Sequence, residues 1–264
     1  MVSDVADCHF RLASLACPAG EDHAWCLTMG ELQTFEVFGS EQRTQEPLAR
    51  GVQSIPGYNV AAGTDLTGSP GLFRHPFARP MFPFNSFYFV VANGVLRFFL
   101  TNDPHFDALH FDTATGGTFA PELLRQSEGA DASDADLSAF AAHGGKLLMV
   151  HGTTDATIPT GASVEFHQML EERMGQARVD SFVRFYLIPG FGHGGGVFDA
   201  GFDALGVLDQ WLDSGMPPHD LVVSDNHRFQ GGRTRPLCAY PGWPRYVGGN
   251  VHQASSFVCS GAGE

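Results

Sequence analysis

Two segments of the sequence combine the residue types that acid–base catalysis needs. Residues 151–159 read HGTTDATIP and contain Asp155, and residues 189–196 read PGFGHGGG and contain His193. A neutral imidazole can take the proton of a weakly nucleophilic hydroxyl, and a carboxylate bonded to that imidazole fixes its tautomer and stabilises the imidazolium. The glycines around His193 allow the tight turn that would aim its ring into a pocket. Asp155 and His193 are therefore predicted to be the acid and the general base of a catalytic triad.

Both segments follow stretches that are predicted to be buried strands. Residues 146–150, KLLMV, form one largely apolar run, and residues 182–188, FVRFYLI, form another. Apolar side chains recur with helical spacing over residues 161–175 and 202–212. An order of strand, helix, strand, helix predicts an α/β fold with the tail of a parallel sheet. The two candidate segments then leave the carboxyl ends of the strands, where open α/β sheets place reactive groups.

Composition excludes several classes of protein. With 264 residues, of which 43% are hydrophobic, the chain can bury a substantial core. A formal net charge of −14, without a basic run longer than two residues, argues against a nucleic-acid partner. An apolar stretch of about 18 residues is missing from the sequence, so no membrane-spanning helix is predicted. The first ten residues, MVSDVADCHF, lack the charged and apolar regions of a signal peptide.

The first 120 residues show little long-range periodicity. A helix is predicted over Met29–Phe38, because Thr28 and Glu31 have the spacing of a capping box. Residues 39–83 are rich in glycine and proline and are predicted to be coil and turns, whereas residues 127–138 are predicted to be a linker or a helix start.

Aromatic side chains crowd residues 77–106. Core packing is the favoured interpretation for most of them, because aromatic rings contribute large apolar areas to protein cores. Phe84 and Phe87 are also candidates for a ligand-facing wall.

Two clusters of polar side chains contain the residue types that bind metal ions. The first comprises Cys8, His9, Cys17, His23 and Cys26, but its C-x8-C-x8-C pattern lacks the short cysteine spacing of zinc sites. The second comprises Asp103, His105, Asp107, His110 and Asp112, for which a solvated loop is the favoured interpretation. No metal site is predicted from either cluster.

Four blocks resemble the successive C-terminal blocks of the tannase and feruloyl esterase family. They are GGKLLMVHGTTDATIP, YLIPGFGHGGG, FDALGVLDQWLDSGMPP and TRPLCAYPGWPRY. Upstream, LRFFLTNDPHFDALHFD resembles the family's segment before the core resumes, and CHFRLASLACPAGEDHAWCLT resembles its cysteine-bearing lid segment. The resemblance covers nearly the whole chain, and the order of the blocks is more specific than any single motif.

This resemblance implies an α/β-hydrolase fold with an inserted lid domain. Residues 1–120 would be part of the irregular, loop-rich lid, and residues 121–264 the C-terminal portion of the parallel-sheet core. The implied activity is the hydrolysis of aromatic-acid esters by a Ser-His-Asp acyl-enzyme mechanism, with Asp155 as the acid and His193 as the general base. No cofactor is implied for this chain, because the family's calcium-binding loop would lie upstream of it.

The cysteines indicate an oxidising compartment. All five lie in loops rich in glycine, proline and polar residues, as structural disulfides do in secreted proteins; five free buried thiols are the alternative. The resemblance implies the pairs Cys17–Cys26 and Cys238–Cys259, and the partner of Cys8 would lie upstream. A secreted or periplasmic location is therefore expected.

The sequence departs from the family pattern at the nucleophile. A G-x-S-x-G turn should precede the lid, and no serine of the sequence has that context. Family members usually carry a cysteine directly after the catalytic histidine, where this chain has Gly194. The leading hypothesis is a fragment or truncated product of a secreted ester hydrolase that acts on aromatic-acid esters. The alternatives are a non-catalytic remnant that binds aromatic ligands and a subunit that needs an N-terminal partner chain. An N-terminal complementing chain or a homo-oligomer is the expected protein partner.

Overall fold

The structure is a computed structural model of the 264-residue chain, and it describes residues 10–64, 84–227 and 231–261. The chain forms two compact units. The first unit consists of Met1–Ser40, Gly57–Asp65 and Ala135–Glu264, and the second of Glu41–Pro56 and Leu66–Asp134. The division of the sequence at residue 120 rests on the family resemblance and stays a prediction.

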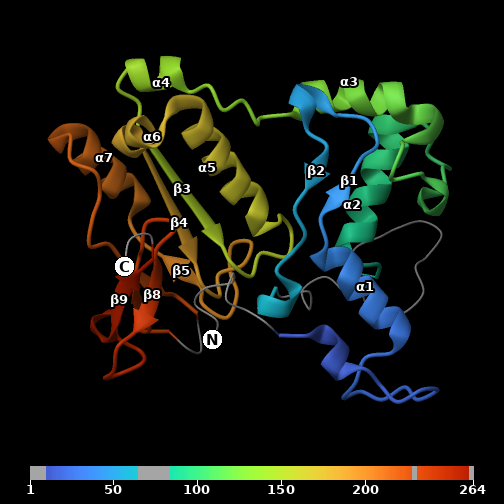
Figure 1. Ribbon diagram of the computed structural model, residues 1–264, viewed down its shortest axis with the longest axis horizontal. Helices are drawn as coiled ribbons and strands as arrows, with labels where there is room; N and C mark the ends of the chain where they lie inside the picture. The colour runs from blue at the N-terminus through green and yellow to red at the C-terminus, as the bar shows by residue number, and fades with distance from the viewer. Residues whose placement is uncertain (1–9, 65–83, 228–230, 262–264) are drawn as a thin grey trace. The chain divides into compact units, whose positions relative to one another are not determined.

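A pair of parallel strands organises the first unit. Strands β3 (Leu147–Gly152) and β4 (Val183–Ile188) lie side by side as the yellow arrows of Figure 1, in a register that pairs Leu147 with Val183 and Gly152 with Ile188. The connection between them contains α5 (Thr160–Met174) and α6 (Gln176–Phe182). The predicted order of strand, helix, strand is confirmed, with boundaries shifted by one or two residues; α6 was not predicted.

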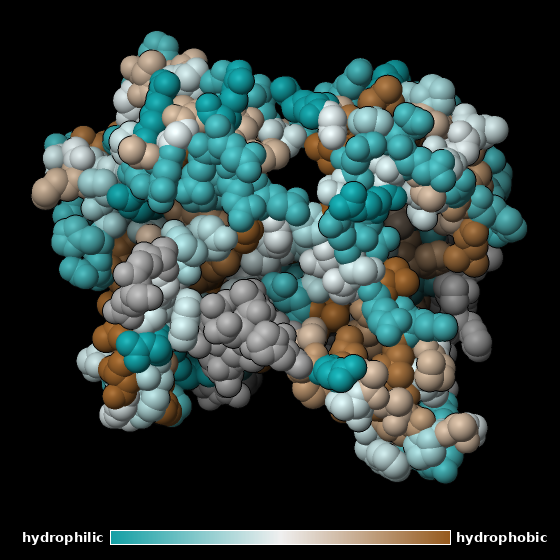
Figure 2. All heavy atoms as spheres, viewed as in Figure 1, coloured by the Kyte–Doolittle hydropathy of each residue, from teal (hydrophilic) through white to brown (hydrophobic). Residues whose placement is uncertain are grey.

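Both faces of the parallel pair are covered, which explains why its strands read as nearly continuous apolar runs. One face packs against α5 and α6, and its cluster comprises Leu147, Met149, Val183, Leu170, Val179 and Phe182. The opposite face packs against the segments that follow β4, and its cluster comprises Leu148, Tyr186, Ile188, Phe198, Val223 and Leu237. The outer side of α5 is polar, and Figure 2 shows mostly hydrophilic (teal) side chains there.

In the described residues after β4, the chain forms α7 and five short strands. Helix α7 spans Ala204–Ser214 and confirms the helix predicted over residues 202–212. Antiparallel pairing joins β5 to β6 and β6 to β7, and also joins β8 to β9. The strands are β5 (Ala200–Gly201), β6 (Val222–Asp225), β7 (Thr234–Pro236), β8 (Trp243–Tyr246) and β9 (Phe257–Ser260). The disulfide Cys238–Cys259 ties the segment after β7 to β9.

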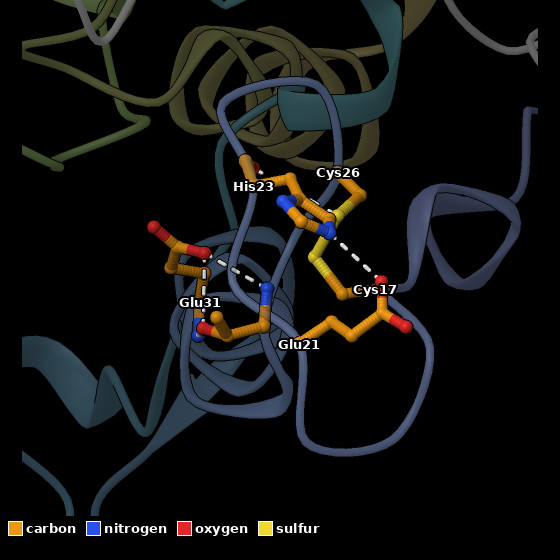
Figure 3. Close-up of a disulfide and its surroundings, with 6 residues drawn as sticks. Cys17, Glu21, His23, Cys26 and Glu31 are labelled. Carbon is orange, nitrogen blue, oxygen red and sulfur yellow. Dashed lines mark hydrogen bonds and ion pairs between the residues drawn. A yellow bond between two sulfur atoms is a disulfide. The ribbon is translucent and has the colours of Figure 1, made fainter.

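The first described residues of this unit are held by a second disulfide and a helix cap. Cys17 and Cys26 are disulfide-bonded beside an ion pair between His23 and Glu21 (Figure 3). A 3-10 helix, η1 (Leu12–Leu15), precedes this loop, and α1 (Met29–Gly39) follows it. The Thr28 hydroxyl accepts the N–H of Glu31, and the Glu31 carboxylate accepts the N–H of Thr28. The predicted helix and its capping box are confirmed.

The second unit is mainly helical. Its longer elements are α2 (Phe87–Val95), which continues into the π-helix η5 (Leu96–Leu100), and α3 (Ala120–Ala130). The segment predicted as coil contains only the two-residue strands β1 (Gln42–Arg43) and β2 (Ser54–Ile55) and short 3-10 turns, and its residues 65–83 lie outside the described part. The predicted linker begins as the last turn of α3 and then runs without regular structure to α4 (Ser138–Ala142). In the described residues, no helix is long and apolar enough to cross a membrane.

Candidate active site

The two candidate segments meet because their strands are parallel neighbours. The turn that carries Asp155 follows the end of β3 at Gly152, and the loop that carries His193 follows the end of β4 at Ile188. Gly152 and Ile188 are themselves paired in the register, so both segments begin at the same edge of the strand pair. The His193 Nδ1 atom lies 3.0 Å from the Asp155 Oδ2 atom.

The two side chains differ sharply in exposure. Asp155 is 5% exposed, whereas the His193 side chain is 59% exposed. Because the carboxylate only accepts hydrogen bonds, the short contact places the proton of neutral His193 on Nδ1. The Nε2 atom then has a free lone pair, and no partner for it lies within the described residues. The pair has the geometry of a general base held by a buried carboxylate.

The carboxylate of Asp155 is held in the ionised form by its surroundings. Burial alone would raise the pKa of Asp155, but N–H groups donated by Ile158 and Thr157, together with His193, outweigh this effect and lower it. The Oδ1 atom receives both N–H groups, at 2.7 Å from Thr157 and 3.0 Å from Ile158. Asp155 is therefore a charged, oriented acceptor.

A second imidazole contacts the same carboxylate oxygen. His151, on β3, is 8% exposed, and its Nε2 atom lies 3.3 Å from Asp155 Oδ2. The Nδ1 atom of His151 lies 2.7 Å from the hydroxyl of Ser163 on α5. Ser163, His151, Asp155 and His193 thus form a continuous chain of polar contacts. No role was predicted for His151 or Ser163, although the spacing of four residues between His151 and Asp155 was visible in the sequence.

Close backbone contacts fix the two segments against each other. The N–H and the hydroxyl of Thr154 both donate to the carbonyl of Phe191, at 3.0 and 2.9 Å. The N–H of Gly190 donates to the hydroxyl of Thr153 at 3.2 Å. Gly152 passes so close to the Phe191 carbonyl that a side chain at this position would collide with it. These contacts limit how far His193 can move from Asp155.

Tyr58 and Asn59 also support the turn around Asp155. The Tyr58 hydroxyl donates to the carbonyl of Thr157 at 3.0 Å, and the Asn59 amide donates to the carbonyl of Thr153 at 3.1 Å. Burial and, to a smaller extent, the charge of Asp155 raise the pKa of Tyr58. Sequence patterns could not have identified these contacts, because Tyr58 lies 99 residues before its partner in a segment predicted as coil.

The structure also locates most of the other residues that the sequence singles out. Phe84, which is half-buried, and Phe87, which is 38% exposed, belong to the second unit. Their assignment to an aromatic substrate stays a prediction. Gly194 has a φ of 81°, a conformation that glycine adopts readily. Cys8 and His9 lie outside the described residues.

Neither candidate metal cluster forms a binding site in the part of the chain that the structure describes. Cys17 and Cys26 form a disulfide, so neither can supply a thiolate ligand. In the acidic segment, Asp103, Asp107 and Asp112 accept backbone N–H groups of their own turns.

The structure is thus that of a mixed α/β protein, in which a buried aspartate and an exposed histidine meet at one end of a parallel strand pair. The sequence matches the family model described as "Tannase and feruloyl esterase" over residues 1–260, and the chain belongs to this family. An uncharacterized esterase of Agrobacterium fabrum is 32% identical over 240 residues, which cover 89% of this chain and 43% of that protein. A probable feruloyl esterase of Arthroderma benhamiae is 38% identical over 183 residues, which cover 65% of this chain and 33% of that protein.

The fold also resembles that of a solved structure, and the match again covers only part of the longer chain. The crystal structure of feruloyl esterase B from Aspergillus oryzae matches with a TM-score of 0.75 at 21% identity, over 98% of this chain and 51% of that one. The chain therefore spans about half the length, or less, of the relatives that it matches.

Proposed function

We propose that this chain supplies the acid and the general base of a carboxylic ester hydrolase that acts on esters of aromatic acids. The observation that carries the proposal is the 3.0 Å contact between His193 Nδ1 and the buried carboxylate of Asp155, at the shared edge of two parallel strands. Membership of a family described by tannase and feruloyl esterase supports both the reaction and the class of substrate.

In the proposed reaction, His193 transfers one proton in each of two half-reactions. Its Nε2 atom takes the proton of a serine hydroxyl as the oxygen attacks the ester carbonyl, and Asp155 stabilises the resulting imidazolium. The same proton then passes to the departing alcohol as the tetrahedral intermediate collapses to an acyl-enzyme. Water then attacks the acyl-enzyme carbonyl while His193 takes one of its protons. His193 returns this proton to the serine oxygen as the bond to the acyl group breaks, so the carboxylic acid leaves and the enzyme returns to its starting state.

The nucleophile is proposed to come from a polypeptide segment outside these 264 residues. No serine of the sequence has the G-x-S-x-G context, and the matched relatives are about twice as long or longer. A complementing chain is therefore the proposed partner. Homo-oligomer formation stays a separate prediction, because a second copy of this chain would add no serine in the required context. Phe84 and Phe87 are proposed to contact the aromatic acid, and the two disulfides support a secreted or periplasmic location.

A fusion protein tests the proposal. The part of the Agrobacterium fabrum esterase that lies outside its match to this chain would be joined to these 264 residues. The fusion should hydrolyse methyl ferulate and methyl gallate, and Asp155→Asn and His193→Ala should each abolish turnover without unfolding the protein. His219→Ala is the matched control, because His219 also contacts an aspartate at 3.0 Å, but at an exposed position.

The same fusion tests the aromatic contacts. Phe84→Ala and Phe87→Ala should raise the KM for methyl ferulate more than the KM for p-nitrophenyl acetate, which carries no aromatic acyl group. Equal effects of the two variants on both substrates would remove these residues from the proposed binding site.

A further inference from the structure

A cleft among the C-terminal strands contains positive charge, and its lining includes neither Asp155 nor His193. Its volume is about 410 Å³, within the usual size range of small-molecule sites. The wall combines apolar side chains with two arginines and a histidine, and none of the described residues that line it is acidic. The lining residues are Pro189, Arg233, Arg235, Pro244, Tyr246, Val251, His252 and Phe257.

One of the two arginines is already neutralised. The Arg233 guanidinium donates to the carboxylate of Asp225, with Nε to Oδ2 at 2.6 Å, and the Asp225 side chain is completely buried. Arg233 also donates to the carbonyl of Val197. The second oxygen of Asp225 accepts the N–H groups of Asp199 and His227, at 2.9 and 3.0 Å. This carboxylate therefore has little capacity left for a second guanidinium.

The other arginine lacks such a partner. Within the described residues, the one hydrogen bond of the Arg235 guanidinium goes from Nη1 to the neighbouring carbonyl of Thr234, at 2.7 Å. Its central carbon lies 4.1 Å from the ring centroid of Phe257, so the guanidinium is held over an aromatic face. Burial, and then the charge of Arg233, lower the pKa of Arg235 by more than the charge of Asp225 raises it, so nearby negative charge only partly compensates the guanidinium. This occurs in a chain whose formal net charge is −14.

Most of the other lining residues are apolar, so they favour a ligand that carries an apolar group beside its negative charge. Pro189, Pro244 and Val251 line the cleft together with the ring of Phe257. Val247, Val251 and Val258 are exposed, and Figure 2 shows hydrophobic (brown) surface over β8 and β9. A small inorganic anion would leave these apolar walls in contact with water.

We propose that this cleft binds a small organic acid, with the carboxylate paired to Arg235 and an apolar ring or chain against Pro189, Pro244 and Phe257. A guanidinium presents parallel N–H groups that match a carboxylate, and one uncompensated charge matches a monoanion. The site goes beyond the proposed ester hydrolysis: its lining includes neither Asp155 nor His193, and it shares only Pro189 with the loop that carries His193.

Calorimetric titration of the full chain with benzoate tests this site. Benzoate should bind saturably at one site, and both benzamide, which lacks the charge, and acetate, which lacks the ring, should bind at least about tenfold more weakly. Arg235→Gln should weaken benzoate binding at least about tenfold. Arg184→Gln should leave binding unchanged, because Arg184 also lies over an aromatic ring, at 5.6 Å from that of Trp211, but outside the cleft.

A second variant keeps the test decisive if Arg235→Gln disturbs folding. Val251 is 49% exposed at the cleft, and Val251→Trp would fill the space while leaving the arginine in place. It should also abolish benzoate binding. The proposal is overturned if benzoate does not bind, if benzamide or acetate binds as tightly as benzoate, or if Val251→Trp retains full affinity. Because the readout is binding of an acid, its result does not depend on whether the chain hydrolyses esters.

Discussion

The close approach of the two site segments at Gly152 gives a sharp prediction for Gly152→Ala. A Cβ atom at residue 152 would lie 2.0 Å from the carbonyl oxygen and 2.4 Å from the carbonyl carbon of Phe191, and 3.0 Å from the carbonyl oxygen of Gly192. Non-bonded carbon and oxygen atoms do not approach this closely, so the loop that carries His193 must move away by about 1 Å or more.

The free-energy cost follows from the contacts that this movement breaks. The Phe191 carbonyl accepts two hydrogen bonds from Thr154, and each contributes about 1 kcal/mol to stability. Overpacking of a well-packed site costs a further ~1–3 kcal/mol. Gly152→Ala should therefore lower the free energy of unfolding by about 3–5 kcal/mol. It should also weaken the hydrogen bond between His193 and Asp155.

Urea denaturation followed by tryptophan fluorescence measures the stability, and NMR of the imidazole N–H proton of His193 reports on the hydrogen bond. Gly195→Ala is the matched control, because residue 195 lies in the same loop, does not have a positive φ, and has no atom within 4 Å of the place that a Cβ atom would take. A cost below about 0.5 kcal/mol for Gly152→Ala, or an equal destabilisation of the control, would show that this contact does not hold the two segments in place.

Individual contacts lead to four more predictions. Burial lowers the pKa of His167 from its usual 6.5, so the unfolded chain takes up the proton first as the pH falls below 6.5. The free energy of unfolding should then decrease by up to about 1.4 kcal/mol per pH unit, and His167→Gln should remove this slope in denaturation measured at pH 7.5 and 5.5. Replacing Cys238 and Cys259 together by serine opens a loop with a sequence separation of 21 and should cost about 3 kcal/mol in the same assay. At pH 8.5, nitrogen NMR should show the neutral ring of His151 protonated at Nε2, because Asp155 can only accept there and Ser163 can donate to Nδ1; a ring protonated at Nδ1 would contradict this geometry. The isolated chain and its His193→Ala variant should both fail to hydrolyse methyl ferulate, whereas activity abolished by the substitution would show that a serine of this chain is the nucleophile.

The parallel strands and the helices α5 and α7 could be predicted because each carries a strong local pattern. The runs around Leu147 and Val183 are apolar on both faces, and α5 and α7 have helical spacing. Parallel pairing then brings Asp155 and His193 together without further information. The capping box of α1 was equally predictable, because the bonds of Thr28 and Glu31 lie within one turn.

The antiparallel strands at the C-terminus carried no such pattern. Pro236 ends β7 and Pro244 lies within β8, and proline argues against a strand when only the sequence is considered. The cleft around Arg235 depends on the pairing of these strands, so it could not be predicted from local patterns. The contacts of Ser163 with His151 and of Tyr58 with Thr157 also depend on tertiary structure, because they join residues 12 and 99 positions apart.

His193, oriented by Asp155, is proposed to be the general base of an ester hydrolase, and one kinetic comparison bears on this role most directly. The fusion joins this chain to the unmatched part of the Agrobacterium fabrum esterase. The comparison is between kcat/KM for methyl ferulate of this fusion and that of its His193→Ala variant. We expect a loss of at least about 10³-fold, because a triad without its base retains little catalysis. A folded fusion that has no activity, or one whose activity survives the substitution, would contradict the proposed role of His193.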